Sequence, residues 1–494
     1  MTAFPMDEYN RLLLNNIFPK DWKNPPPAKV YDLVVIGGGP GGMTAATVAL
    51  QKKARVAIVE KAHFGGECLN VGCIPSKALL RSSRLAAEIR DAAEMGMRVP
   101  EGWSVDFAAV MRRMRKTRSE ISAFDRLQHF TQLGADIFLG TARFAGPNTL
   151  EVEGRVLHFK KTLIATGTEP VVLDVPGIKK AGYLTNQTVF NLTALPKRLA
   201  VIGAGPISCE LAQAFARFGS HVTLIARGER LLPKGDTTAS DALRAHFEKE
   251  GMQLLFSSHV QRCETRGSEK ILYLDTYPKG ISVDEMLIAI GRRPAVEDLE
   301  LDKAHVRFDT KTGILTNDAL QTHNPCIFVI DVSPRYNFTH VSMELAKMAV
   351  HNALFEGKTL RTSLIIPRCT FTDPEIAEVG LNEKEAKEQG IAVQTVTQYL
   401  ADNVRAILDG ETMGFVKIHL KQGTDQILGA TIMARHAGEM ISEISVAMSA
   451  QKGLAAIAEA IHPFPTQAEI LRSVAEAGLK TVTKAVKPSK KAAA

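Results

Sequence analysis

The feature that most constrains the fold is a strand–turn–helix–strand unit that occurs twice in the chain. The first copy starts with the apolar run Asp32–Ile36, passes through the turn Gly37–Gly42 and a helical stretch over 43–52, and reaches a second apolar run over 55–59. Apolar runs of this length predict buried parallel strands. A parallel strand pair joined by a helix requires a layered α/β architecture.

The glycine-rich turn of the first copy has the spacing of a dinucleotide-binding fingerprint. Gly37 allows the tight turn, Gly39 lets the backbone approach a pyrophosphate, and Gly42 lets helix and strand pack closely. The helix N-terminus adds amide donors and a positive dipole. Glu60 ends the second strand, where an acid accepts hydrogen bonds from ribose hydroxyls. Strand, helix, strand and terminal acid in this order predict a dinucleotide site.

The second copy repeats these elements further along the chain. A strand over 198–202 leads into Gly203 and Gly205, and Ser208 occupies the third glycine position, which a small side chain can fill. A helix over 209–218 and a strand over 222–226 follow. The sequence therefore predicts a second dinucleotide site.

The two copies differ at the acid. Ala226 stands at the position of Glu60, 23 residues after the first glycine in each copy, and Arg227 and Arg230 follow it. The second site lacks the acid that would repel a 2′-phosphate and offers guanidinium groups to bind one. We therefore expect FAD at the first site and NADPH at the second.

Two cysteines, Cys68 and Cys73, follow the first copy in the run Gly65–Lys77. Two thiols with four residues between them can form a disulfide if a short helical turn brings the sulfurs together. Such a disulfide accepts two electrons, and thiol exchange needs one exposed thiolate and a second thiol to resolve it. The alternatives are two unrelated core cysteines or half of a metal site. The spacing is not that of a zinc knuckle, and no His or Cys cluster accompanies it, so no metal site is predicted.

Together these motifs resemble the pyridine nucleotide-disulfide oxidoreductases, the family of lipoamide dehydrogenase, glutathione reductase and mercuric reductase. The resemblance runs from about Tyr31 to about Leu479. It includes both fingerprints, the cysteine run, Ala165–Gly167, Ala289–Pro294 and the stretch from Ile427 to Ile441. It implies an enzyme that uses FAD and NADPH, with an α/β fold of two Rossmann-like domains and a C-terminal α+β dimerisation domain. The further cofactor-binding positions that it implies are Lys61, Gly66, Lys77, Thr166, Gly167, Gly291, Asp331 and Thr339.

The resemblance divides the chain into segments. We expect an N-terminal extension over 1–29 and an FAD-binding domain over 30–183. A nucleotide domain over 184–285 is inserted into it, and the chain returns to the FAD domain over 286–358. A dimerisation domain over 363–480 and a disordered basic tail over 481–494 complete the chain. A dimerisation domain implies a homodimer.

The resemblance also assigns roles to individual residues. NADPH would deliver hydride to one face of the flavin, and the disulfide would be reduced on the other face. Cys73, at a helix start that favours the thiolate, would face the flavin. Cys68 would be the interchange thiol that meets substrate, and Lys77 would pair with Glu210.

The family pattern breaks at the C-terminus. Members that reduce disulfides have a His as the base for the interchange thiol, supplied by the partner subunit, and an acid that orients it. Here Phe464 stands at the position of that His, and Phe cannot move a proton. Glu469 keeps the position of the acid, and His462 lies two residues before Phe464. The pattern argues against turnover of lipoamide or glutathione.

Two further departures concern metal delivery and the flavin. Mercuric reductase ends in a cysteine pair that hands over metal, whereas this chain has no cysteine after Cys369. In the last FAD segment the family has Gly-Asp after a strand. Here Ile330-Asp331 lacks the glycine, and Pro334 replaces a second one. The missing glycine predicts backbone strain or weaker FAD binding at Asp331.

Composition limits the other function classes. The chain has 494 residues, 45% of them hydrophobic and 23% charged, and a net charge of +7. No basic patch with interleaved aromatic residues accompanies that charge, so we expect no nucleic-acid partner. The apolar stretch over 33–51 contains five glycines and Pro40, so we expect no membrane span. Scattered cysteines and the lack of a secretory signal favour the cytoplasm.

We therefore predict an oxidoreductase that passes electrons from NADPH through FAD to the Cys68–Cys73 pair and on to a small acceptor. A soft metal ion or a quinone would suit the mercuric reductase-like pattern. The first alternative is a dihydrolipoamide dehydrogenase with an altered base. The second is a flavin-binding sensor or interaction protein with little turnover, which the altered segment at Asp331 motivates.

Overall fold

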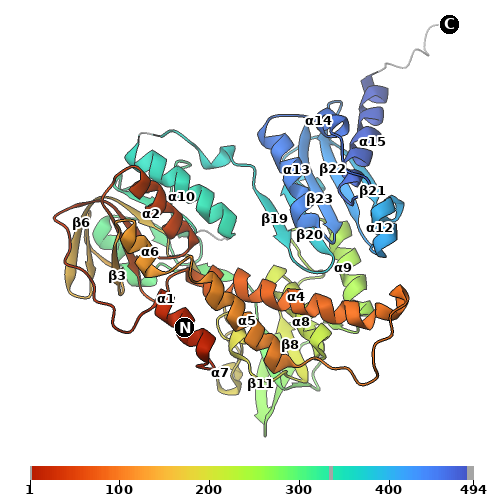
Figure 1. The fold of residues 1–494 in the computed structure, drawn as a ribbon, viewed down its shortest axis with the longest axis horizontal. Helices are drawn as coiled ribbons and strands as arrows, with labels where there is room; N and C mark the ends of the chain where they lie inside the picture. Colours follow the sequence, from red (N-terminus) through yellow and green to blue (C-terminus); the bar gives the residue numbers. More distant parts are fainter. Residues whose placement is uncertain (1–2, 333–337, 356, 487–494) are drawn as a thin grey trace. The chain divides into compact units, whose positions relative to one another are not determined.

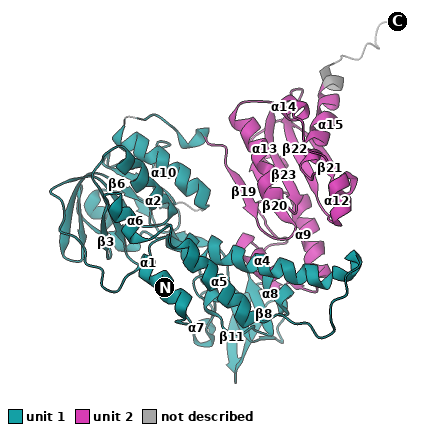
Figure 2. Ribbon diagram, in the orientation of Figure 1, with its two compact units in different colours: residues 1–203, 214–223, 259–363 teal, residues 204–213, 224–258, 364–494 magenta. Residues whose placement is uncertain are grey.

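The computed structural model of the chain describes residues 3–332, 338–355 and 357–486 (Figure 1). The chain forms two compact units (Figure 2). Unit 1 comprises Met1–Gly203, Ala214–Thr223 and His259–Ser363. Unit 2 comprises Ala204–Gln213, Leu224–Ser258 and Leu364–Ala494.

A seven-stranded sheet organises unit 1. The strand order is β3-β2-β1-β6-β5-β4, and β18 pairs with the free edge of the carboxyl half of β6. The parallel strands are β1 (Tyr31–Ile36), β2 (Val56–Glu60), β3 (Asp136–Leu139), β6 (Arg155–Ile164) and β18 (Ile327–Val329). The antiparallel strands are β4 (Arg143–Gly146) and β5 (Thr149–Val152), which extend the sheet from the first half of β6. The predicted strands over 32–36 and 55–59 are confirmed to within one residue.

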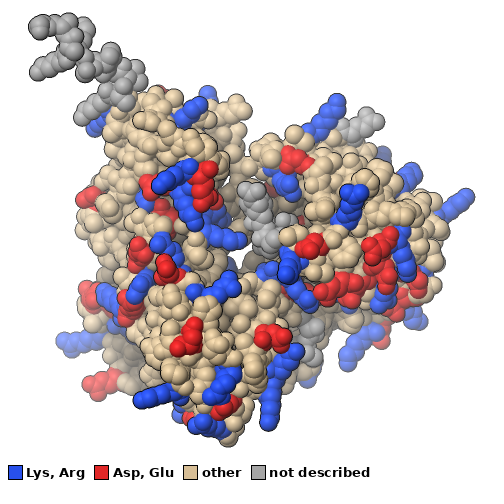
Figure 3. Space-filling model, turned by 180° about the vertical axis from the view of Figure 1, so that it is seen from behind, with Lys and Arg blue, Asp and Glu red and all other residues tan. Residues whose placement is uncertain are grey.

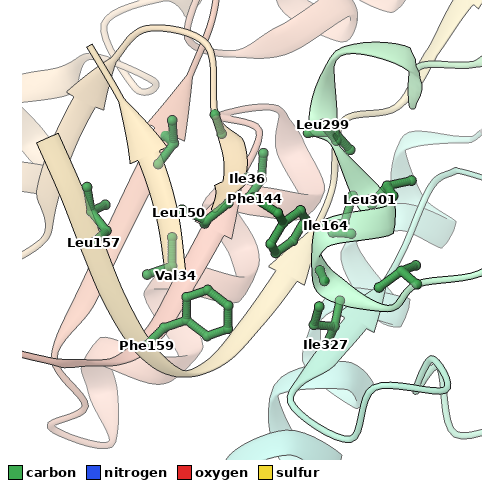
Figure 4. Close-up of a cluster of buried hydrophobic side chains, with 14 of the residues drawn as sticks. Val34, Ile36, Phe144, Leu150, Leu157, Phe159, Ile164, Leu299, Leu301 and Ile327 are labelled. Atoms are coloured by element: carbon green, nitrogen blue, oxygen red, sulfur yellow. The ribbon is translucent and has the colours of Figure 1, made fainter. Parts of the chain in front are cut away.

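Helices α2 (Pro40–Gln51) and α10 (Thr339–Leu354) lie side by side on one face of this sheet (Figure 1). They approach closely because α2 contains Gly41, where an added Cβ would lie 2.2 Å from the Ser342 hydroxyl. The other face carries a large cluster of buried apolar side chains (Figure 4). In it, Phe144 and Leu301 pack among residues of β1, β4, β5 and β6. The sheet is therefore buried on both sides, as its continuous apolar strands require.

Unit 1 contains further helices. Those nearest Cys68 and Cys73 in sequence are α1 (Glu8–Ile17), α3 (Gly66–Val71), α4 (Cys73–Arg90), α5 (Phe107–Ile121) and α6 (Leu127–Gln132), and the short α7 (Ile178–Ala181) follows further along the chain. The predicted N-terminal extension is not separate from the fold, since Leu13 and Ile17 of α1 are fully buried.

The second nucleotide-binding segment begins in unit 1. There β8 (Arg198–Ile202) pairs in parallel with β14 (Glu285–Ile288). It continues through α8 (Pro206–Phe218), β9 (His221–Ile225), α9 (Thr237–Lys249) and β10 (Gln253–Leu255). The strand–turn–helix–strand order predicted for this copy is confirmed.

Unit 2 contains a five-stranded antiparallel sheet. Its strands, in order, are β19 (Pro367–Thr370), β20 (Glu375–Gly380), β23 (Ile427–Ala434), β22 (Phe415–Lys421) and β21 (Val393–Tyr399). Helices α13 (Ala437–Ser449), α14 (Leu454–Glu459) and α15 (Glu469–Val486) pack against it through one apolar core. This is the α+β arrangement expected after 363.

The prediction of a disordered tail over 481–494 is wrong for its first six residues. Helix α15 continues to Val486. The reason is that Leu479 and Val482 pack against the core of unit 2, which extends the apolar face of the helix. Residues 487–494 lie outside the described residues.

Two surface properties bear on partners. No helix among the described residues is both long and apolar enough to cross a bilayer. On the face shown in Figure 3, lysines and arginines are interspersed with aspartates and glutamates. The net positive charge is thus not gathered into one patch on that face.

Candidate active site

Cys68 and Cys73 lie on two consecutive helices of unit 1. Cys68 is on α3, Cys73 is the first residue of α4, and Gly72 joins the two helices. Both cysteine side chains are partly buried. A hydrogen bond with Cys73 and burial together raise the pKa of the Cys68 thiol. The short helical turn expected to bring the two thiols together is therefore present.

The start of α4 favours a thiolate at Cys73. The helix has 18 residues, so its N-terminal amides carry the partial positive charge of a full macrodipole. The Cys73 Sγ also lies 3.5 Å from the hydroxyl oxygen of Thr339, the first residue of α10. Two helix N-termini thus meet at one sulfur. Thr339, which the sequence identified as a flavin-contact position, is placed beside the redox pair.

The carbonyl and side-chain groups around the pair hold the segment in place. The Asn70 amide donates to the carbonyl of Gly66 at 2.8 Å and to that of Phe64 at 3.1 Å. Glu67 forms an ion pair with Arg292. Sequence reasoning missed this pair, although Arg292 lies in a segment that carried the family resemblance. The feature of the sequence that could have indicated this pair is the acid Glu67, which directly follows two glycines.

The first glycine turn packs closely against the backbone around it only because these residues have no side chains. Gly37 has φ +114°, and a Cβ there would lie 2.3 Å from the Ala165 carbonyl oxygen. A Cβ at Gly42 would lie 1.9 Å from the carbonyl oxygen of Gly37. Gly39 faces Gly66, with no side chain between the two backbones. These residues fit the role predicted for them in binding FAD.

Glu60 is positioned at the end of β2 beside this turn. Its carboxylate accepts hydrogen bonds from the amides of Gly38 and Ala62, each at 2.7 Å. Burial raises the pKa of the Glu60 carboxyl. The neighbouring Lys61 forms exposed ion pairs with Glu169 at 3.7 Å and Asp298 at 3.4 Å.

Asp331 has the backbone strain that the missing glycine predicted. Its φ is +60°, in the left-handed region, which costs a non-glycine residue about 1 kcal/mol. Burial raises the pKa of its carboxyl to about 7, and a hydrogen bond from Ser342 opposes that rise. The Ser342 hydroxyl donates to Oδ2 at 3.3 Å. That the strain at Asp331 weakens FAD binding stays a prediction. Pro334 lies outside the described residues.

Three further residues predicted to bind FAD, Thr166, Gly167 and Gly291, lie next to a pair of short antiparallel strands. These strands are β7 (Thr168–Pro170) and β15 (Arg292–Pro294). The Thr166 hydroxyl donates to the Ala295 carbonyl at 2.8 Å. Gly167 and Gly291 both have positive φ, at +69° and +134°. The pairing of β7 with β15 joins two segments that are far apart in the sequence.

The second nucleotide site has the open features that a phosphate needs. An added Cβ at Gly205 would meet no atom within 4 Å, whereas Gly203 has φ +133° and Ser208 is fully buried. Among the described residues of unit 2, Arg227 is exposed and makes no ion pair, and Arg230 also has none. Both guanidinium groups can therefore bind an anion.

The residues of the altered C-terminal motif lie close together on unit 2, but His462 is already bound. Its Nε2 lies 3.1 Å from Glu443 and its Nδ1 lies 3.2 Å from the Ala460 carbonyl. The His462 side chain is only 6% exposed, whereas Phe464 is 70% exposed. Glu469 begins α15 and has no imidazole at the motif position to orient.

Lys77 and Glu210 belong to different units. Lys77 lies on α4 of unit 1, and Glu210 on the α8 segment of unit 2 accepts a hydrogen bond from the Phe371 amide at 3.0 Å. Their pairing stays a prediction.

A pocket of about 520 Å³ in unit 1 reaches Cys68. Its walls are largely apolar and include Met43, Ile121 and Met343. Asp125 also lines it, and burial raises the pKa of this carboxyl to about 6. Sequence reasoning missed Asp125, because nothing in the sequence distinguishes it from a surface loop residue. The described residues contain no cluster of three or more His, Cys, Asp and Glu side chains that could hold a resident metal ion.

Comparison with known proteins agrees with this geometry. Residues 31–353 match the family described as pyridine nucleotide-disulphide oxidoreductase, and residues 366–475 match its dimerisation domain. A mercuric reductase of Staphylococcus aureus is 33% identical over 457 residues, which cover 92% of this chain and 83% of the relative. A dihydrolipoyl dehydrogenase of Mycoplasma pneumoniae is 33% identical over 456 residues, covering 91% and 98%.

Among solved structures, the Cu(II) complex of the HOCl-induced flavoprotein disulfide reductase RclA from Escherichia coli has the same fold. The TM-score is 0.82 at 26% identity, and the match covers 91% of this chain and 100% of that one. The predicted α/β fold and the use of FAD and a pyridine nucleotide are thereby confirmed. The chain belongs to the pyridine nucleotide-disulphide oxidoreductase family.

Proposed function

We propose that this flavoprotein oxidoreductase takes electrons from NADPH, passes them to the Cys68–Cys73 pair, and reduces a small acceptor that needs no imidazole base. A soft metal ion or a quinone is such an acceptor. The observation that carries the proposal is the state of the C-terminal motif. Phe464 occupies the position of the base, and the ring of His462 is held by Glu443.

The missing base matters because disulfide substrates release a thiolate that must be protonated. A general base or acid contributes about 10²–10⁴-fold to such a step. An exposed phenyl ring provides an apolar wall instead. A soft ion bound by a thiolate, or a flat acceptor against the aromatic ring, does not require that proton transfer.

FAD, when bound, relays an electron pair from the nicotinamide to the cysteine pair. The residues of this chain prepare that transfer. The N-termini of α4 and α10 stabilise a thiolate at Cys73, while burial and the hydrogen bond with Cys73 keep Cys68 protonated. Cys68 lines the 520 Å³ pocket and is therefore the thiol that an acceptor in this pocket would meet.

Preference for NADPH is supported by the second glycine site. Ala226 removes the acid, and the exposed Arg227 is free of ion pairs within the described residues. A guanidinium group binds a 2′-phosphate through charge-assisted hydrogen bonds.

We also propose that the chain acts as a homodimer. Its dimerisation domain exposes large apolar side chains, among them Ile407 at 56%, Leu408 at 65%, Val446 at 68% and Ile461 at 91% exposure. Large apolar side chains left exposed on a domain of this family support an interface with a second copy of the chain.

The solved structure of RclA is a Cu(II) complex, which supports a soft metal ion as the acceptor. A second candidate is a dihydrolipoyl dehydrogenase, because that class matches at the same 33% identity as mercuric reductase. The two candidates differ in acceptor and in nucleotide.

The experiment measures NADPH and NADH oxidation by the FAD-loaded protein with lipoamide, glutathione disulfide, mercuric ion, cupric ion and quinones. We expect NADPH oxidation with an ion or a quinone that is lost in Cys68→Ser, while Cys263→Ser, at a buried cysteine on β11 (Val260–Arg266) outside both glycine-rich turns, keeps it. NADH-dependent lipoamide reduction as the fastest reaction would favour the dehydrogenase instead.

A further inference from the structure

The N-terminal helix α1 lies outside the part of the chain that matches the family, which begins at residue 31. It is nevertheless built into unit 1. Its inward face consists of Asn10, Leu13 and Ile17, which are 0%, 2% and 0% exposed. Burial of Leu13 and Ile17 would be enough to dock the apolar face of the helix on unit 1. The fully buried amide of Asn10 therefore needs a separate explanation.

Asn10 binds a buried arginine of α5. Its Oδ1 accepts a hydrogen bond from Nη2 of Arg118 at 2.7 Å, and Arg118 is only 3% exposed. The Nδ2 of Asn10 donates to the Pro5 carbonyl at 2.8 Å, which fixes the orientation of the amide. Burial lowers the pKa of Arg118 to about 10, so the guanidinium is still charged at neutral pH.

The same guanidinium holds the redox segment. Nη1 of Arg118 donates to the carbonyl of Asn70 at 2.6 Å. Asn70 lies between Cys68 and Cys73, and its own side chain closes the turn from Phe64 to Gly66. A direct path of hydrogen bonds therefore runs from α1 through Arg118 to the loop that carries both thiols.

Two other contacts of the extension reinforce this path. Asp7 caps α1 and binds Nε of Arg115 at 2.6 Å, which places one acid beside two buried arginines of α5. The Ile17 carbonyl accepts a hydrogen bond from the Phe64 amide at 3.3 Å. Asp7 is the acid whose charge favours the protonated form of Arg118.

We propose that α1 is an intramolecular clamp and Asn10 a positioning residue, which together hold the Cys68–Cys73 loop in the geometry that closes the disulfide. This inference rests on the redox role proposed for the two cysteines. A loop that is held in place gives the two thiols a high effective concentration and so stabilises the disulfide. When the clamp is released, that advantage is lost and the dithiol is favoured.

The test measures the equilibrium of the Cys68–Cys73 pair with a dithiothreitol redox buffer, read as the mass of the alkylated protein. In Asn10→Leu we expect the equilibrium constant for the disulfide to fall by roughly three- to ten-fold, and a tenfold fall is about 30 mV. Asn10→Asp keeps the oxygen that binds Arg118 but loses the donor to the Pro5 carbonyl, so its equilibrium constant should fall less than that of Asn10→Leu. Asp7→Asn is a second variant, for the case that Asn10→Leu does not fold. It removes only the charge beside Arg115 and should also lower the equilibrium constant for the disulfide.

The matched control is Glu8→Gln. Glu8 joins the same two helices through Arg112 at 2.8 Å, but both side chains are exposed, at 59% and 63%. It should leave the equilibrium unchanged. If Asn10→Leu and Asp7→Asn lower only the urea midpoint and leave the equilibrium at the wild-type value, α1 is no clamp. If the wild-type protein forms no disulfide between Cys68 and Cys73, the proposed function itself fails.

Discussion

Three side chains at the candidate site have protonation states that the fold influences. Cys73 lies where two helix N-termini favour a thiolate, and Cys68 is kept protonated by burial and by its partner thiol. Asp125 lines the same pocket as Cys68. Its carboxyl has a pKa of about 6 in the fold against 3.8 for a free side chain, because burial disfavours the charged form.

That shift predicts a pH-dependent effect of Asp125→Asn. A raised pKa stabilises the fold below pH 3.8, and this contribution is lost as pH rises through about 6. At about pH 8 the substitution should therefore raise the free energy of unfolding by about 1–2 kcal/mol, and near pH 4 by almost nothing. Urea midpoints at both pH values measure it. Asp174→Asn, whose side chain is 96% exposed, is the control. An equal effect of Asp125→Asn at both pH values would contradict the shift.

We expect Arg227 to determine the preference for NADPH over NADH. Arg227→Ala should weaken NADPH by about 10-fold or more, because a charge-assisted contact contributes about 1.5–3 kcal/mol. The KM for NADH should not change, and steady-state kinetics with both nucleotides measure the ratio. Equal losses for the two nucleotides would show that Arg227 does not bind the 2′-phosphate.

At the level of elements, we expect the segment between α14 and α15 to decide which acceptor is reduced. Phe464 lies in it with its ring exposed, and Glu469 starts the helix that follows. Phe464→His should raise lipoamide reduction by roughly 10²-fold, because it restores the base where an acid already stands. The same assay on Phe464→Leu is the control and should show no gain. An unchanged rate in Phe464→His would mean that the missing imidazole is not what limits disulfide turnover.

A buried ion pair ties α9 to the sheet of unit 2. Lys417 on β22 binds the N-cap acid Asp236 at 2.8 Å, with the side chains 7% and 3% exposed. Lys417→Met should lower the free energy of unfolding by about 3–5 kcal/mol, because it leaves a buried carboxylate uncompensated. Urea denaturation measures this loss. The exposed pair of Lys384 and Glu388, 77% and 64% exposed, is the control, and Lys384→Met should change stability by less than about 1 kcal/mol. Similar effects of the two substitutions would contradict the assignment of a buried pair.

For the whole molecule, the elements predicted correctly from the sequence are those that depend on the local sequence alone. The strands and helices of both glycine units follow from apolar runs and from glycines whose Cβ would clash, such as Gly37 and Gly42. The strain at Asp331 followed from a glycine that was missing.

The contacts that the sequence did not predict join segments far apart in the chain. Arg118 binds Asn10 and Asn70, which lie 108 and 48 residues away, and no local pattern pairs them. The same holds for Glu67 and Arg292, and for His462 and Glu443. The end of α15 was missed because apolar side chains within a basic stretch pack on a core that only the fold creates.

Above all, we propose that Cys68 and Cys73 form a redox disulfide that exchanges electrons with the flavin. The experiment is an anaerobic reductive titration of the FAD-loaded protein, followed by flavin absorbance. We expect each wild-type chain to take up one electron pair for the flavin and a second for the disulfide, and Cys68→Ser to take up only the first. A wild-type protein that takes up only the pair belonging to the flavin would contradict it.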